Sequence, residues 1–345
     1  MKMVLRSLLL VAALVVLRAS AWVTLTLTRP ALVNLPQHIQ TLIIVDRTLP
    51  ADVKKNKIES VLTGEMPHQD EQAVEQVING VISVVNNGQR MRAIRTTEKF
   101  VGGSDGKTFP EAMSWTVITN LCQKYKADAA LVLETFDSDY ILTHGRAKVQ
   151  QNEDGTPALS FYAEGVGTVN LGFRVYDPSQ KVISDEFQFN HEARWNAGGS
   201  SITAAVEGLM NKTEAVKQVS YDAGSLYGQR ITPTYYRVRR YFYDKPKRNH
   251  KLTEGVRKSK VADWQGAIES WQEAMKIAKK RKHRGRIAYD IAVGYEVLGD
   301  LDKALDWASK AYVDYKEKWA DDYVRQLKNR INEEAVVREQ LGTDQ

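Results

Sequence analysis

The feature that most limits the fold of this chain is a regular alternation of apolar runs and amphipathic helical segments in its first half. Residues 39–48, IQTLIIVDRT, are typical of a buried strand, and residues 69–89 place apolar side chains on one helical face. Residues 90–97 and 127–136 read as two further strands, and the segment between them as a second helix that includes Cys122. This order predicts parallel strands joined by helices that cover the sheet.

The pattern changes in the next part of the chain. Residues 166–176 alternate apolar and polar side chains, and a turn signal separates them from a second alternating stretch, residues 181–195. This predicts an antiparallel hairpin with one buried face. Residues 198–231 then read as one long helix capped by Ser200 or Ser201. Its inward-facing residues are predicted to be Ile202, Val206, Leu209, Val216, Val219 and Leu226. The predicted fold class is α/β (α+β), a mixed sheet in the order β-α-β-α-β-β-β-α followed by an all-α section.

The final section is helical, highly charged and internally repetitive. Residues 262–278 and 299–315 are similar to each other, with small residues at matching positions after a period of 37 residues. Residues 286–299 supply a leading helix for the second copy, so the section resembles tetratricopeptide repeats, whose usual period is ~34 residues. The basic run KKRKHRGR, residues 279–286, accounts for the excess length. The first copy shows no recognisable leading helix.

The beginning of the chain has the features of a secretory signal peptide. Lys2 and Arg6 precede an apolar run at residues 8–17, and a small-x-small triplet ends at Ala21, where cleavage is expected. The run is much shorter than the ~20 apolar residues that a spanning helix needs. An uncleaved amino-terminal anchor is the alternative. Lysine and arginine number 48 against 42 acids, a small excess that gives weak support for nucleic-acid binding.

These patterns divide the chain into a signal peptide, residues 1–21, an α/β domain, residues 22–244, and a tetratricopeptide-like helical domain, residues 245–345. The single cysteine, Cys122, belongs to an apolar stripe at helical spacing. We therefore expect a buried thiol that behaves as a small hydrophobic residue.

Residues 101–113, VGGSDGKTFPEAM, raise the question of a phosphate-binding loop. Such a loop needs Gly-x-x-x-x-Gly-Lys-Ser/Thr, but Val101 stands where the first glycine belongs. Pro110 also removes a backbone donor from the expected first helical turn. Thr108 followed by Glu111 fits a capping box instead. We therefore expect a capped loop and no cofactor.

Three carboxylates, Glu134, Asp137 and Asp139, gather near the end of the third predicted strand. Carboxylates in such a position bind cations or act as acids and bases, which makes an enzyme acting on envelope glycans or phosphoesters the alternative hypothesis. A solvated strand end is the simpler interpretation. HEAR at His191 begins like a zinc-protease motif, but Trp195 occupies the second histidine position. We predict no metal site and no catalytic residue.

A stretch rich in tyrosine and arginine, residues 230–251, is the strongest local anomaly. Both residue types are enriched at protein interfaces, and both stack on bases, sugars or head groups. The favoured interpretation is a junction that packs its tyrosines between two domains while its arginines pair with acids elsewhere, and a binding surface is the alternative. The candidate partner-binding residues are Tyr236, Arg237, Arg239, Arg240 and Tyr241, together with Trp271 and Tyr295 of the helical section.

Residues 29–48 and 227–243, RPALVNLPQHIQTLIIVDRT and YGQRITPTYYRVRRYFY, together with the repeat-like tail, are similar to a family of envelope lipoproteins of Bacteroidota that carries a domain of unknown function. Members commonly have a lipid-modified cysteine after the signal, whereas Trp22 follows Ala21 here, which favours a secreted or periplasmic form. The element order is also similar to that of the amino-terminal domain of TolB, a likeness of fold that does not establish function.

We therefore expect a non-enzymatic adaptor or scaffold of the cell envelope that binds a protein partner through helical-repeat and α/β surfaces. About two helical hairpins are fewer than the ~3 repeats that an independent solenoid needs, so the tail should pack on the α/β domain or bind a partner. The expected location is the periplasm or the outer membrane. Export argues against nucleic acid as a ligand. We expect no transmembrane helix in the mature chain, and association with a membrane surface is an open alternative.

Overall fold

The computed structural model shows a chain that forms two compact units. The first, here called the helical unit, combines the described residues up to Leu27 with Tyr236–Asn332, and the second, the α/β unit, combines Thr28–Tyr235 with the end of the chain from Glu333. The described residues are 21–49, 69–103, 106–143, 148–151, 157–244 and 249–343. The predicted signal peptide lies outside them, apart from Ala21. The expected fold class, a mixed sheet with covering helices followed by a helical region, is confirmed.

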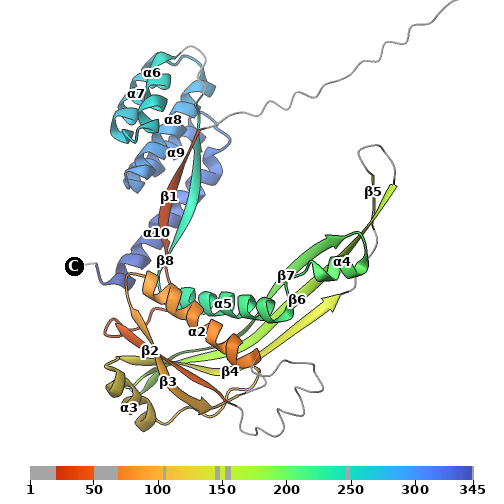
Figure 1. The fold of residues 1–345 in the computed structure, drawn as a ribbon. Coiled ribbons are helices and arrows are strands. Elements are labelled where there is room, and N and C mark those ends of the chain that lie inside the picture. Colours follow the sequence, from red (N-terminus) through yellow and green to blue (C-terminus); the bar gives the residue numbers. More distant parts are fainter. Residues whose placement is uncertain are drawn as a thin grey trace, which may run out of the picture. The chain divides into compact units, whose positions relative to one another are not determined.

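The α/β unit is built on a six-stranded mixed sheet (Figure 1). Its main path runs β3-β2-β4-β6-β5, and β7 also pairs with β6. β2 is parallel to both β3 and β4, whereas β4, β5 and β7 are antiparallel to β6. The strands are β2 Thr41–Leu49, β3 Arg92–Val101, β4 Ala129–Thr143, β5 Lys148–Gln151, β6 Pro157–Asp177 and β7 Val182–Gly199.

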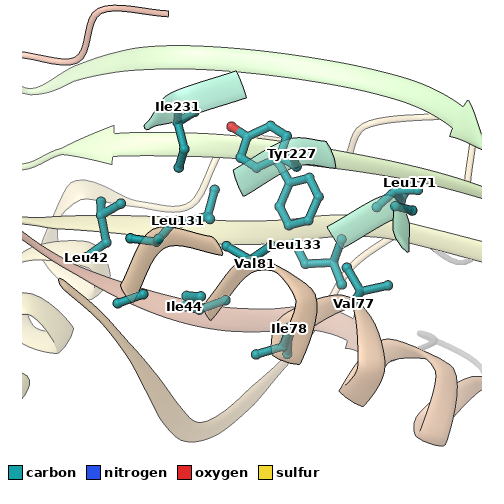
Figure 2. Close-up of a cluster of buried hydrophobic side chains, with 14 of the residues drawn as sticks. Leu42, Ile44, Val77, Ile78, Val81, Leu131, Leu133, Leu171, Tyr227 and Ile231 are labelled. Carbon is teal, nitrogen blue, oxygen red and sulfur yellow. The ribbon is translucent and has the colours of Figure 1, made fainter. Parts of the chain in front are cut away.

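Helices cover both faces of this sheet because alternate residues of its central strands point in opposite directions. Leu42 and Ile44 of β2 pack with α2, Gln69–Asn87, and α5, Lys212–Ile231, as Figure 2 shows. Ile43 and Val45 pack instead with α3, Trp115–Tyr125. Both strand faces are therefore buried, which explains the continuous apolar run that predicted β2.

Two glycines allow α2 and α5 to approach each other closely. A Cβ atom on Gly80 of α2 would lie 2.2 Å from the carbonyl oxygen of Tyr221, and one on Gly224 of α5 would lie 2.0 Å from that of Val77. Because each helix presents a glycine to the backbone of the other, larger residues at these two positions would force the helices apart.

Two predicted helix boundaries were wrong. α3 begins at Trp115 after the N-cap Ser114, so Thr108 does not cap it with Glu111 as a capping box. The predicted single helix over residues 198–231 is divided, because Asn211 caps a new helix start with its side chain. The first part is α4, Ile202–Glu207, which Ser201 caps as predicted.

The division changes which side chains of this segment face inward. Val216 and Val219 are buried as predicted, and Val206 and Leu209 are half-buried. Ile202 and Leu226 are 46% and 42% exposed, so their inward placement was wrong.

The helical unit contains a β-ribbon and most of the C-terminal helices. Its strands β1, Ala21–Arg29, and β8, Thr234–Phe242, form a two-stranded sheet. The helices are α6 His250–Lys260, α7 Trp264–Ile277, α8 Arg281–Val297, α9 Leu301–Val313 and α10 Ala320–Leu341, the last of which also contributes residues to the α/β unit. α6 precedes α7 and packs on it, so the first copy has the leading helix that the sequence did not reveal.

Small residues permit close packing of these helices, as their spacing predicted. Ala267 and Ala274 of α7 and Ala304, Ala308 and Ala311 of α9 are all fully buried. They share one core with Trp271 and with residues of α8. Within the described residues, none of the helices is both long and apolar enough to cross a membrane.

Candidate functional site

The first place to look for a site is the point where the sheet connections diverge. The chain leaves β2 for β3 through α2, then crosses to the other side of β2, to β4, through α3. Open α/β sheets bind ligands outside the carboxyl ends of their strands at such a divergence, which here lies between β2 and β4.

The glycine-rich loop after β3 fills this point with its own backbone. Gly102 donates its N–H to the carbonyl of Leu49 at the end of β2, at 3.0 Å, and Gly103 donates to the carbonyl of Glu134 in β4, also at 3.0 Å. A Cβ atom on Gly102 would lie 1.6 Å from the carbonyl oxygen of Arg47. The glycines are therefore required for close approach to two strands.

The Gly-Lys-Thr letters that follow are not placed as in a phosphate-binding loop. In that loop the motif leads directly into a helix whose first N–H groups face the phosphate. Here residues 106–108 are followed by a segment that is neither helix nor strand, and α3 begins only at Trp115. The arrangement therefore lacks the helix start on which such binding depends.

Beneath this loop, Glu134 is held in a buried network. Its carboxylate is fully buried and accepts from Nη1 of Arg47 at 2.8 Å and from the hydroxyl of Tyr176 at 2.5 Å. Arg174 lies 3.5 Å from the same carboxylate and donates to the carbonyl of Pro110 in the loop at 2.8 Å. The network joins the sheet to the loop, and removing one of its arginines would leave a buried carboxylate with less compensating charge.

The three candidate carboxylates do not converge on one point. A register shift between Leu133 and Thr135 marks a β-bulge at Glu134, and β4 continues beyond it, so the acids lie within a strand and not at its end. Burial, and then the nearby Asp70, raise the pKa of Asp137, whereas Asp139 is exposed. The part of the chain that the structure describes holds no group of three acidic, histidine or cysteine side chains suited to a metal ion.

Two further nucleophile candidates are held in unreactive surroundings. Burial raises the pKa of the Cys122 thiol to about 12, so the thiol is neutral at physiological pH. Ser179 and Asp177 both contact Nε2 of His38, at 3.2 and 2.9 Å, and the serine hydroxyl donates to Asp177 at 2.7 Å. A hydrolytic triad needs its acid and its serine on opposite ring nitrogens, and this cluster does not have that arrangement.

The tyrosine- and arginine-rich segment forms β8, and strand alternation decides which of its side chains are accessible. Arg237, Arg239 and Tyr241 point outward and are exposed. Arg239 lies over the ring of Trp22 in β1, with its Cζ atom 4.9 Å from the ring centroid. We call these four side chains, Trp22, Arg237, Arg239 and Tyr241, the ribbon face.

The alternate residues of β8 point inward and pack within the helical unit. Arg240 pairs with Glu296 of α8, and Phe242 lies in the core with Trp264 and Trp271. Tyr236 is half-buried. The two interpretations of this segment therefore apply to opposite faces of one strand, an exposed face and a packed one.

The two candidates from the helical section have different surroundings. Trp271 has no exposed surface, so it acts as a core residue and offers no contact to a partner. Tyr295 is half-buried, its hydroxyl accepts a hydrogen bond from Nε2 of Gln272 at 3.3 Å, and its ring lies under Lys303.

A pocket of about 400 Å³ opens beside the ribbon face, within the helical unit. Trp22 and Val23 of β1, Phe242 of β8 and Trp264 of α7 supply its apolar lining, and Lys260 is among its charged residues. Sequence reasoning missed Trp22 because it was considered only as the residue after the cleavage site. The alternation in AWVTLTLT, typical of a strand, was the signal that could have found it.

Comparison with known families identifies the chain at the level of its domains. A model described as "Domain of unknown function (DUF8603)" matches residues 39–243, more than half of the chain. The chain belongs to this family. A second model, "Domain of unknown function (DUF6340)", matches residues 253–329. The DUF8603 match thus covers most of the α/β unit, and the DUF6340 match covers most of α6 to α10. A search of curated proteins found no matching sequence.

Two of the solved structures that match this chain are distant likenesses. One is a putative neuraminyllactose-binding hemagglutinin homolog from Helicobacter pylori, with 12% identity, coverage of 56% of this chain and 80% of that chain, and a TM-score of 0.25. Another is lipoprotein GNA1162 from Neisseria meningitidis, with 14% identity, coverage of 55% and 98%, and a TM-score of 0.16. Because both TM-scores are low, neither likeness supports a statement about function.

Proposed function

We propose that this DUF8603 protein is a non-enzymatic adaptor of the cell envelope that binds a protein partner through its helical unit. The observation that supports this most directly is the ribbon face, where Trp22, Arg237, Arg239 and Tyr241 are exposed together on one β-ribbon. Tryptophan, tyrosine and arginine are the residues most enriched among the energetically dominant contacts of protein interfaces.

The charges of the ribbon face favour a partner with an acidic surface. Neither Arg237 nor Arg239 forms an ion pair with another described residue. Both are exposed and remain available to a carboxylate of the partner. Planar guanidinium groups bind carboxylates through two parallel hydrogen bonds, which gives such a contact both strength and orientation.

The pocket beside the ribbon face supplies the apolar part of the proposed interface. Interface anchors are aromatic or aliphatic side chains that enter pockets surrounded by polar contacts. The aromatic lining from Trp22, Phe242 and Trp264 suits an apolar side chain of the partner, and Lys260 and Asp244 lie at the same pocket.

The envelope location is supported by the sequence at the beginning of the chain. Lys2 and Arg6 before a short apolar run, with the small-x-small triplet ending at Ala21, are the features of an exported protein. The periplasm or the outer membrane is the compartment we propose. Cell fractionation with antibodies to the native protein tests this part independently of partner binding.

The partner proposal is tested by cross-linking in native cells followed by mass spectrometry. A fourfold variant, Trp22→Ala, Arg237→Ala, Arg239→Ala and Tyr241→Ala, should lose the cross-linked partner that the wild-type protein captures. The matched control, Thr24→Ala with Thr26→Ala, changes exposed residues of the same ribbon and should keep it. Circular dichroism of both purified variants checks that the fold is intact.

Retention of every cross-linked partner by the folded fourfold variant would contradict the proposal. Equal loss by the control variant would also contradict it, because the binding would then depend on the ribbon as a structure and not on its aromatic and arginine side chains.

A further inference from the structure

A second pocket in the helical unit is strongly basic and has no part in the proposed partner surface. It measures about 350 Å³ and lies where α8 begins, next to the connection from α9 to α10. This volume falls at the lower end of the ~300–1,000 Å³ that small-molecule sites occupy. We call it the basic pocket. Its lining residues are Tyr243, Arg281, Lys282, Arg286, Tyr315, Lys316, Glu317, Lys318 and Trp319.

Five cations surround this small space, and Glu317 of its lining and the buried Asp290 next to Arg286 offset them in part. Within the described part of the chain, Arg281, Lys282, Arg286, Lys316 and Lys318 form no ion pair. Glu317 is 8% exposed and accepts a hydrogen bond from the hydroxyl of Tyr243 at 2.8 Å. Several like charges held close together without counter-charges destabilise a folded chain, unless an anion joins them.

The position of these cations on α8 strengthens this argument. The first turn of a helix carries a partial positive charge, so acids are favoured there and cations are not. α8 nevertheless begins with Arg281 and Lys282, has no acid in its first turn, and its N-cap Lys280 makes no side-chain cap. A bound anion would satisfy both the free N–H groups and the cations.

One guanidinium in the pocket has an unsatisfied donor. The Nε atom of Arg286 is buried and has no hydrogen-bond partner among the described residues. Its guanidinium lies over the ring of Tyr243, with Cζ 4.6 Å from the centroid, so its position is fixed by packing. A buried donor without an acceptor costs free energy, so this guanidinium is held at the pocket by its contact with Tyr243 and not by an internal acceptor for Nε.

An aromatic surface adjoins the cations. Trp319 stacks on Tyr243, with ring centroids 5.0 Å apart and an interplanar angle of 11°, and it remains 40% exposed. Its exposed part offers a flat apolar surface for a sugar or aromatic ring. The pocket therefore combines recognition elements for a multiply charged anion and for a ring.

We propose that the basic pocket binds the phosphate group of a phosphorylated ligand, with the ring of that ligand against Trp319. A phosphate monoester carries nearly two negative charges at neutral pH and three acceptor oxygens, which fits several cations better than a single carboxylate does. This function goes beyond partner binding, because none of its residues belongs to the ribbon face.

Isothermal titration calorimetry of the full-length protein at low ionic strength tests the site. The probes are inorganic phosphate, pyrophosphate and glucose 6-phosphate, with glucose as the uncharged control. We expect the phosphates to bind and glucose not to bind. Binding should weaken as salt is added, because exposed charges are screened. Phosphates that bind no better than glucose would overturn the proposal.

Matched double variants locate the binding. Lys282→Ala with Lys318→Ala removes two exposed cations of the pocket and should weaken phosphate binding by about tenfold or more. Lys310→Ala with Lys328→Ala removes the same charge from exposed positions outside the pocket and should leave binding nearly unchanged. Equal weakening by both pairs would show that only the overall charge matters, and would overturn the site.

Two further measurements define the ligand. Trp319→Ala should weaken binding of glucose 6-phosphate more than binding of inorganic phosphate, and an unchanged ratio would overturn the contact with the ring. Sedimentation with vesicles of phosphatidylcholine containing phosphatidic acid distinguishes the source of the phosphate. Vesicle binding that Lys282→Ala with Lys318→Ala abolishes would assign a lipid head group, and binding of the free compounds alone would assign a soluble ligand.

Discussion

The guanidinium of Arg240 binds the carboxylate of Glu296 through two hydrogen bonds, from Nε to Oε2 at 2.8 Å and from Nη2 to Oε1 at 3.1 Å. Tyr323 and Arg330 also donate to this carboxylate, at 2.7 and 2.8 Å. Glu296 is 1% exposed, so the network joins β8, α8 and α10 inside the helical unit. Adjacent arginines of one strand therefore have different roles, since Arg239 lies on the ribbon face.

This difference predicts opposite outcomes for neighbouring substitutions. Arg240→Ala should destabilise the protein by about 3–5 kcal/mol, because it leaves a buried carboxylate with too little compensating charge. Arg239→Ala should change the free energy of unfolding by less than about 1 kcal/mol, as for an exposed site. Urea unfolding followed by tryptophan fluorescence checks both. Similar losses in the two variants would mean that Arg240 is not the buried partner of Glu296.

The same network predicts a loss of stability in acid. Burial alone would raise the pKa of Glu296, but the hydrogen bond and charge of Arg240, together with the hydrogen bonds of Tyr323 and Arg330, outweigh burial and hold the pKa below its usual 4.5. The folded state therefore binds fewer protons than the unfolded state, so this stabilisation is present above pH 4.5 and is lost as the pH falls through the folded pKa. Glu296→Gln should be less stable than the wild type at pH 7. The difference in free energy of unfolding between the two proteins should become smaller below pH 4.5. A stability difference between the two proteins that does not change between pH 3 and pH 7 would refute the lowered pKa of Glu296.

Asp290 predicts a pH dependence of the opposite sign. It is fully buried, and although its Oδ1 accepts the N–H of Tyr243, its Oδ2 has no partner among the described residues. Burial holds the pKa of Asp290 well above its usual 3.8, so folding binds a proton. The contribution of protonated Asp290 to the stability of the fold is fully present below pH 3.8 and is lost as the pH rises through the pKa of the folded state.

Asp290→Asn keeps the shape and the acceptor for Tyr243 but does not titrate. We therefore expect its melting temperature relative to the wild type to increase from pH 4 to pH 8. Differential scanning calorimetry across this range measures the trend. A relative melting temperature that falls with pH would contradict the raised pKa.

Substitution of Gly102 tests the close approach of the loop to β2. Gly102→Ala places a Cβ atom on the carbonyl oxygen of Arg47 and should destabilise the α/β unit by at least the ~1–3 kcal/mol typical of overpacking. Gly198→Ala is the matched control, because a Cβ atom there would make an ordinary contact of 3.7 Å with the carbonyl of Phe161. Equal stability of the two variants in urea would show that the loop is free to move away from β2.

Much of the fold could be predicted from local patterns, and the failures have physical reasons. Apolar periodicity identified β2, α2, the β6–β7 hairpin and the buried alanines of α7 and α9, because burial imposes its period on the sequence. The start of α3 was misplaced because Thr108 and Glu111 satisfy a local capping rule that the loop's contacts with β2 and β4 override. Asn211 was missed as a cap because the apolar spacing continues across it.

The candidate site was less accessible to such reasoning. Alternation along residues 235–242 was visible in the sequence, but nothing local showed that Arg240 would meet Glu296, 56 residues away. Likewise the basic run at residues 279–286 was visible, yet its neighbours in the basic pocket come from the connection after α9. Contacts between distant segments decide which charges are neutralised and which remain available.

The backbone of Gly102 and Gly103, which is hydrogen-bonded to β2 and β4, limits how a ligand site could arise at this edge of the sheet. A sheet of this topology ordinarily keeps an open crevice there, from which new cofactor chemistry can arise by changes in a few loop residues. Here such a change would first require displacing a segment that is hydrogen-bonded to both strands and replacing the arginine contacts of the buried Glu134. Substitutions of exposed residues on the outer surface, by contrast, leave this hydrogen-bonded framework undisturbed.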